Sequence, residues 1–204
     1  STGVQGIRKL AHILTGCTDL EIGEEDKIWL EALPYPPRYK EGNTNLDMAL
    51  GRISPSELDE GETHSETKGN GIKYGGDGGF ICFCEMKWYS DISKDVTHDK
   101  HRNQLVRVID NALMFEDEED MLPERIFVTL VTPKVFKERK PKSRLYAYKF
   151  EEYANERAIL EDLEGCRLLY RPKPERKKEK EEKVQYHQEK LSQVKGRLQR
   201  HELK

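Results

Sequence analysis

The chain has 204 residues, of which 36% are charged and 35% are hydrophobic. This length suits one domain of moderate size with an appendage, and the composition indicates a compact core with part of the chain outside it. We find no signal peptide and no apolar run long enough to span a bilayer, so we expect a cytoplasmic protein with no membrane partner.

The net charge of −3 is unevenly distributed along the chain. Residues 171–204 carry twelve Lys or Arg against six Glu, a net charge of +6, which leaves −9 for residues 1–170. A basic tail places cationic side chains where phosphates could be bound. We therefore treat residues 1–170 as the body of the protein and residues 171–204 as a basic, charged helical tail.

The first third of the chain predicts two helices and then a strand. Apolar residues recur at helical spacing over 4–14, and a second helix is expected over 24–33, before the prolines at 34, 36 and 37. In the strand-like segment 45–53, Asp47 alternates with apolar neighbours, although it could equally be a turn or cap residue at the strand entrance. The polar, glycine-rich residues 54–79 are expected to form a long loop or insertion.

The most apolar run of the sequence, residues 80–89, predicts a central strand. Alternation places Glu85 and Lys87 on one face, after Ile81 and Phe83, while the other face carries Cys82, Cys84, Met86 and Trp88. Burying a charge is costly unless it is paired or holds a metal, so this charged pair needs an explanation. An ion pair at a fraying strand end is one explanation, and a functional site is the other. Both cysteines are expected to pack as small apolar groups.

The second half of the chain predicts alternating helices and strands. A helix is expected over 95–115, strands over 125–132, 143–150 and 167–170, and another helix over 151–163, capped by Gly165. In the first of these helices we expect Leu105, Val108, Ile109, Ala112 and Leu113 to be buried and Lys100, Gln104, Arg107 and Asn111 to form a polar face. Heptad spacing over 184–201 predicts a solvated helix or an arm that packs or supports a homodimer.

The order of these elements is a helix, a strand with Asp47, a strand with Glu85 and Lys87, a helix with Gln104, and a strand. This order resembles the PD-(D/E)xK nuclease superfamily, which has the restriction-endonuclease-like fold, over roughly residues 24–132. The resemblance implies an α/β fold, namely a three-layer core with a mixed central sheet flanked by helices, here with a C-terminal helical extension. Leu46 replaces the motif's Pro, and the long gap before Glu85 makes Asp77 a rival to Asp47. A first-helix Glu found in many members could be Glu25 or Glu31.

The resemblance implies a metal-dependent nuclease that hydrolyses phosphodiester bonds in DNA. Asp47, Glu85 and the Met86 carbonyl would hold Mg²⁺, with Mn²⁺ as a substitute, because hard cations prefer oxygen ligands. Such a metal polarises the phosphate and lowers the pKa of bound water. Lys87 would orient the nucleophilic water or offset negative charge, and Gln104 would position water or phosphate. Because no helix-turn-helix or zinc module is evident, we expect structure-selective or partner-directed cleavage.

Two other interpretations remain open. A catalytically inactive nucleic-acid-binding or scaffold domain of the same fold would bind through the basic tail and four residues, in a salt-dependent manner: Lys94, Lys100, Arg102 and Arg107. A metal site at His98 and His101 with Asp95 or Asp99 is the other, although no third ligand is evident. The pattern does not distinguish DNA from RNA or exonuclease from endonuclease.

Overall fold

The computed structural model describes residues 2–34, 45–56, 71–76, 78–92, 101–115, 121–139, 145–165 and 180–198. The chain divides into two compact units. The first unit comprises residues 1–37, 43–86 and 114–131, and the second comprises residues 38–42, 87–113 and 132–204. This division differs from the expected boundary at residue 170.

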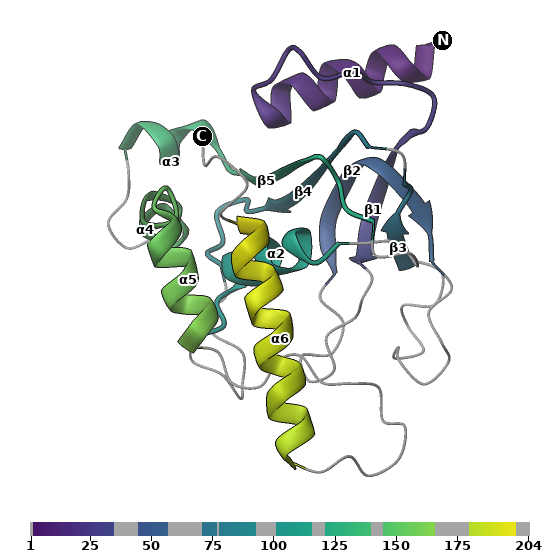
Figure 1. The fold of residues 1–204 in the computed structure, drawn as a ribbon. Coiled ribbons are helices and arrows are strands. Elements are labelled where there is room, and N and C mark those ends of the chain that lie inside the picture. Colours follow the sequence, from purple (N-terminus) through teal and green to yellow (C-terminus); the bar gives the residue numbers. More distant parts are fainter. Residues whose placement is uncertain are drawn as a thin grey trace. The chain divides into compact units, whose positions relative to one another are not determined.

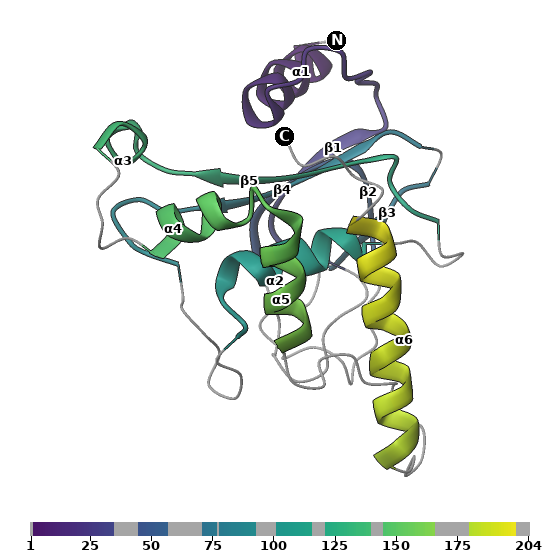
Figure 2. The same ribbon diagram turned by 60° about the vertical axis from the view of Figure 1, so that its left-hand side comes forward.

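The first unit is a helix and a mixed five-stranded sheet (Figure 1). The helix is α1 (Thr2–Thr15), and the strands are β1 (Asp26–Pro34), β2 (Leu46–Pro55), β3 (Gly71–Tyr74), β4 (Phe80–Met86) and β5 (Arg125–Val131). The sheet order is β1-β3-β2-β4-β5, and β1 also pairs with β2. β2 is antiparallel to β1, β3 and β4, whereas β4 and β5 are parallel and lie side by side in Figures 1 and 2. The general α/β class is therefore confirmed.

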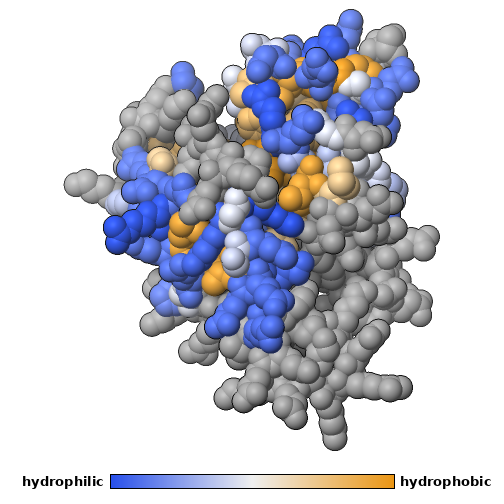
Figure 3. All heavy atoms as spheres, in the orientation of Figure 1, coloured by the Kyte–Doolittle hydropathy of each residue, from blue (hydrophilic) through white to orange (hydrophobic). Residues whose placement is uncertain are grey.

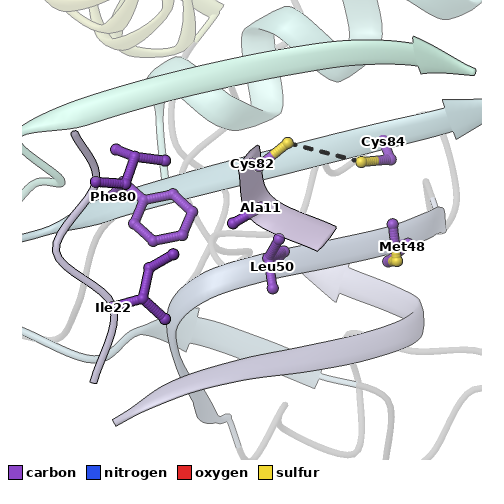
Figure 4. Packing of buried hydrophobic residues seen from close by; sticks show 8 residues of the cluster. Ala11, Ile22, Met48, Leu50, Phe80, Cys82 and Cys84 are labelled. Carbon is purple, nitrogen blue, oxygen red and sulfur yellow. Dashed lines mark hydrogen bonds between the residues drawn. The ribbon is translucent and has the colours of Figure 1, made fainter. Parts of the chain in front are cut away.

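The core of the first unit forms where α1 packs on β2 and β4 (Figure 4). Met48 and Leu50 of β2 meet Phe80, Cys82 and Cys84 of β4, together with Ala11, Leu20 and Ile22. Each large side chain buried here contributes about 1.5–3 kcal/mol. Figure 3 shows hydrophobic residues among hydrophilic ones along α1. The Thr129 hydroxyl of β5 donates a hydrogen bond to the Leu14 carbonyl at 2.8 Å, which fixes the end of α1 to the sheet.

The opposite face of the same strands carries aromatic side chains. Phe83 of β4 meets Phe115 edge-to-face, with ring centroids 5.0 Å apart, and Tyr74 of β3 meets Phe115 at 6.5 Å. Close approach of β2 and β4 requires a glycine. Gly51 has a φ of +119°, and a Cβ there would lie 2.1 Å from the Phe80 carbonyl oxygen.

The second unit is helical. It contains α2 (Gln104–Leu113), α3 (Lys134–Arg139), α4 (Leu145–Glu152), α5 (Glu156–Gly165) and α6 (Lys180–Leu198), of which α2, α5 and α6 contact one another. The expected stripe of α2 is buried throughout. Val194 and Leu198 of α6 are buried as well, and the Arg197 guanidinium donates a hydrogen bond to the Leu113 carbonyl at the end of α2, at 2.9 Å. The end of α6 thus packs and is not fully solvated.

Four expected elements are confirmed: the first helix, the strands at 46–55 and 80–86, and the strand at 125–131. Residues 180–198 are helical, as the heptad spacing indicated. The helix expected over 95–115 begins at Gln104, residues 93–100 lie outside the described part, and Asn111 is buried, so the expected polar face is wrong at that position. The strand expected over 167–170 also lies outside the described residues.

The helix predicted over 24–33 is wrong, because these residues form β1. A short apolar run with Ile28, Leu30 and Ala32 fits either state, and pairing with β2 decides it. Pairing joins Ile28 to Leu50, Leu30 to Met48 and Ala32 to Leu46. The loop expected over 54–79 contains β3, while residues 57–70 and 77 lie outside the described part.

The strand predicted over 143–150 is also wrong, because residues 145–152 form α4. Its alternating apolar residues favoured a strand, yet Asp91 caps the start of a helix here. The Asp91 carboxylate accepts hydrogen bonds from the Leu145 amide at 2.7 Å and the Tyr146 amide at 3.1 Å. A carboxylate at a helix N-terminus satisfies amides that have no partner within the helix. The helix expected over 151–163 is interrupted at 153–155, before α5 begins.

Candidate functional site

The first unit brings the two predicted carboxylates to neighbouring strands. β2 and β4 pair with Met48 opposite Cys84 and Ala49 opposite Phe83. Extending this register by one residue aligns Asp47 with Glu85. Directly opposite residues of an antiparallel pair lie on the same face, with Cβ atoms about 4.5–5.5 Å apart. The carboxylates therefore converge at the start of β2 and the end of β4.

A hydrogen bond joins Asp47 to the end of β4. The Met86 amide donates to Asp47 Oδ2 at an N···O distance of 2.6 Å. This bond orients the Asp47 side chain toward the residue that follows Glu85. The bond uses Oδ2 and the Met86 N–H, and a carboxylate can bind a cation through its second oxygen while the first accepts a hydrogen bond.

The two carboxylates differ in burial. Asp47 is half-buried, whereas Glu85 is only 2% exposed. Two neighbouring carboxylates, one of them buried, repel each other when both are ionised. A cation bound between them removes this repulsion, so the chemistry of these residues fits a hard divalent ion.

Lys87 and Gln104 belong to the second unit, whereas Asp47, Glu85 and Met86 belong to the first. Lys87 follows β4 directly and is half-buried. Gln104 is the first residue of α2 and is also half-buried. It follows Asn103, whose side-chain oxygen accepts a hydrogen bond from the Val106 amide at 3.0 Å and so caps the helix.

Arg102 does not form a surface phosphate contact, contrary to expectation. It is fully buried, and its guanidinium lies 2.7 Å from the Asp110 carboxylate, which is buried too. A buried guanidinium that is held by a buried carboxylate is not available to a nucleic acid. Arg107 is half-buried, while Lys94 and Lys100 lie outside the described residues. Among the four predicted binding residues, only Arg107 is described with a partly exposed side chain.

The rival carboxylate Asp77 lies outside the described residues. Its neighbour Gly78 adjoins the start of β4, whereas Glu85 lies near the other end. The five residue steps from Phe80 to Glu85 in a strand correspond to about 16 Å. Asp47 is described, and the β2–β4 register aligns it with Glu85.

Neither candidate for the first-helix Glu lies in a helix, because Glu25 precedes β1 and Glu31 lies within β1. Both are exposed. Glu31 adopts an unusual φ of 51°, and the β1–β2 register places it beside the position of Asp47. For the proposed histidine site, Asp95, His98 and Asp99 lie outside the described residues.

The two strand cysteines pack in the core, as expected. Both are 0% exposed, and their sulfur atoms lie 3.7 Å apart. The hydrogen bond with Cys82, burial, and the nearby charges of Cys82 and Asp47 all raise the pKa of the Cys84 thiol. A thiol that stays protonated is a poor nucleophile and a poor metal ligand at neutral pH.

Sequence reasoning missed a polar cluster in the second unit. The Tyr153 hydroxyl lies 2.5 Å from Asp162 Oδ2 and accepts a hydrogen bond from the Asn103 amide at 2.7 Å. Lys149 reaches the same carboxylate oxygen at 2.9 Å. Burial and the bond to Asp162 raise the pKa of Tyr153. No local pattern links these residues, which lie up to 59 positions apart.

The strand expected over 80–89 is shorter than predicted, because β4 ends at Met86 and Trp88 is 77% exposed. Its neighbour Tyr89 has a left-handed backbone, with a φ of 60°. A positive φ in a bulky residue is unusual and cannot be recognised from the sequence. The chain therefore leaves the sheet at Lys87, and the aromatic pair lies at the surface.

Among the described residues, no group of three or more His, Cys, Asp or Glu side chains could hold a metal ion. The candidate centre is of another kind, because it combines two carboxylates with a backbone carbonyl.

No helix of the described ranges has the length and apolarity needed to cross a membrane. Comparisons with family models, curated proteins and solved structures found no match to this chain.

Proposed function

We propose that the chain is a Mg²⁺-dependent nuclease that hydrolyses phosphodiester bonds in DNA. The observation that carries this proposal is the hydrogen bond from the Met86 amide to Asp47, because it joins the first predicted carboxylate to the Glu-x-Lys segment. Asp47 and Glu85 are 38 positions apart in the sequence. Their alignment across β2 and β4 is what a shared cation needs.

The element order supports the proposed restriction-endonuclease-like core. The chain runs α1, β1, β2, β4, α2 and β5, with the short β3 between β2 and β4. β4 and β5 are parallel, and a parallel pair needs a long crossover connection, which here contains α2. Glu85 and Met86 lie at the carboxyl end of β4, where open α/β sheets bind their ligands.

Each residue has a role in the proposed mechanism. Asp47, Glu85 and the Met86 carbonyl would hold the metal, which supplies a polarised phosphate and a more acidic water when bound. The Met86 amide orients Asp47 by hydrogen bonding. We assign Lys87 to orienting the attacking water and offsetting negative charge on the phosphate, and Gln104 to positioning water or phosphate.

The test compares nicking of plasmid and branched DNA by the full chain in Mg²⁺. Glu85→Gln, Asp47→Asn and Lys87→Ala should each lower the cleavage rate by about a hundredfold or more. Glu21→Gln, which changes an exposed carboxylate of the first unit, is the matched control and should cleave like the wild type. All variants should still melt cooperatively.

A second readout does not depend on cleavage. Mg²⁺ that binds the folded chain raises its melting temperature by mass action, and Glu85→Gln should abolish this increase. If Glu85→Gln and Lys87→Ala cleave as fast as the wild type, the assignment is wrong. If the wild type binds DNA in a salt-dependent manner but cleaves nothing in Mg²⁺ or Mn²⁺, the chain is an inactive binding domain.

A further inference from the structure

A chain of aromatic rings runs from the interior of the second unit to its surface. Tyr146 is buried and meets Phe136 at a centroid distance of 5.9 Å. Phe136 meets Tyr89 at 5.6 Å, and Tyr89 meets Trp88 at 5.3 Å. All three contacts are edge-to-face, with interplanar angles of 75–89°. We call these four residues the aromatic stack.

The outer end of the stack is open to solvent. Trp88 is 77% exposed and Tyr89 is 57% exposed, so most of the indole is available to another planar group. The left-handed backbone of Tyr89 is unfavourable for an L-residue, so other contacts must hold it. The contact with Phe136 and the cap that Asp91 provides for α4 hold this segment in place. The fold thus fixes two large aromatic side chains at an exposed position.

The segment of the sequence that supplies Phe136 and Tyr146 is basic. Residues 133–149, which include Phe136 and Tyr146, carry seven basic residues against a single Glu138: Lys134, Lys137, Arg139, Lys140, Lys142, Arg144 and Lys149. In the described part, Lys134 is exposed, and Lys149 binds Asp162 and Glu152. Aromatic side chains within a basic segment are the combination by which proteins bind single-stranded nucleic acids, because bases stack on rings while cations contact phosphates.

We propose that the aromatic stack, with Trp88 and Tyr89 at its outer end, binds unpaired bases of a single-stranded nucleic acid. The inference rests on the proposed function and narrows it to substrates that contain an unpaired strand.

The test measures binding of the full chain, in a chelator that prevents cleavage, to fluorescent single-stranded DNA, single-stranded RNA and duplex DNA. Trp88→Ala should weaken single-strand binding about 5- to 150-fold, the effect of one lost base stack. Duplex binding should change less than about twofold, because a paired base offers no free face to the indole. Phe150→Ala is the matched control, since Phe150 is 56% exposed on α4 but makes none of the ring contacts of the stack.

Tryptophan fluorescence gives a direct readout. The chain has two tryptophans, Trp29 in β1 and Trp88. Single-stranded DNA should quench the emission of the wild type and of Trp29→Phe, but not that of Trp88→Phe. Equal quenching in all three proteins would overturn the proposal.

Three further results would also overturn it. One is equal single-strand affinity of Trp88→Ala and Phe150→Ala. Another is an equal loss of single-strand and duplex binding in Trp88→Ala. The third is concentration-dependent self-association that Trp88→Ala abolishes, because the surface would then join two copies of the chain. If the wild type cleaves no DNA but binds single strands in a manner that depends on Trp88, the nuclease proposal fails and this inference stands.

Discussion

We expect substitutions of two adjacent acidic residues of α5, Glu161 and Asp162, to have very different effects on stability. Asp162 accepts hydrogen bonds from the Tyr153 hydroxyl at 2.5 Å and from Lys149 at 2.9 Å. Its neighbour Glu161 is paired only at the surface, with Arg157 at 2.8 Å, and their side chains are 62% and 83% exposed. Replacing either residue by Ala raises helix propensity, and more so for Asp162 than for Glu161, so a larger loss of stability in Asp162→Ala reports the buried cluster.

The expected magnitudes follow from these environments. A hydrogen bond to a charged group contributes about 1.5–3 kcal/mol, and the Lys149–Asp162 pair counts for less because both side chains are about one fifth exposed. Asp162→Ala should therefore lower the free energy of unfolding by about 3 kcal/mol. An exposed helical pair contributes about 0.3–0.5 kcal/mol, so Glu161→Ala should be nearly neutral.

Thermal and denaturant unfolding measure both variants. For a chain of this size, 1 kcal/mol corresponds to roughly 2–4 °C, so Asp162→Ala should melt about 6–12 °C below the wild type. A double-mutant cycle of Asp162→Ala with Tyr153→Phe should give a coupling energy above about 1 kcal/mol. A loss under about 1 kcal/mol for Asp162→Ala, or equal losses for both alanine variants, would refute this account of the cluster.

Two more predictions concern Tyr153 and Gly51. The pKa of Tyr153 is raised above its ordinary value of 10.0, so the folded chain holds this proton more tightly than the unfolded chain. The stabilisation from this proton is complete below pH 10 and is lost as the pH rises above 10. In urea melts at a series of pH values, the wild type should lose stability above pH 10 more steeply than Tyr153→Phe, by about 1.4 kcal/mol per pH unit. Identical slopes for the two proteins would contradict this. In the same melts, Gly51→Ala should lower the free energy of unfolding by more than about 3 kcal/mol, because its Cβ would lie 2.1 Å from the Phe80 carbonyl oxygen. Gly16→Ala, whose Cβ would have nothing within 4 Å, should lower it by only about 1 kcal/mol. Comparable losses for the two variants would argue against the clash.

Local sequence patterns predicted those elements whose own residues determine them. The runs at 80–86 and 125–131 are rich in β-branched and aromatic residues, and both are strands. The spacing of apolar residues in α2 predicted its buried stripe residue by residue. Burial itself is not periodic, because β4 is buried at every residue except Met86 and α2 at every residue except Gln104 and Arg107. Residue composition for the strands and the apolar stripe for α2 therefore carried these predictions.

The failures have different causes. α4 is helical because Asp91, more than fifty positions away, caps its first amides. That partner lies outside any window of neighbouring residues, so the alternating pattern was assigned to a strand. Arg102 pairs with Asp110, only eight positions away, at 2.7 Å. Both are charged residue types that are mostly found at the surface, so the sequence did not indicate that the pair is buried.

For the candidate site, the sequence supplied the residue types and the strand pairing supplied their proximity. Glu85 and Lys87 could have been an ion pair at a fraying strand end. β4, however, stays paired with β5 as far as Met86 opposite Val131, and Glu85 is buried within that paired region. A fraying end would leave Glu85 exposed, so fraying does not account for its position. A buried glutamate in a well-paired strand, aligned with an aspartate that the next amide orients, is the arrangement a divalent cation would stabilise.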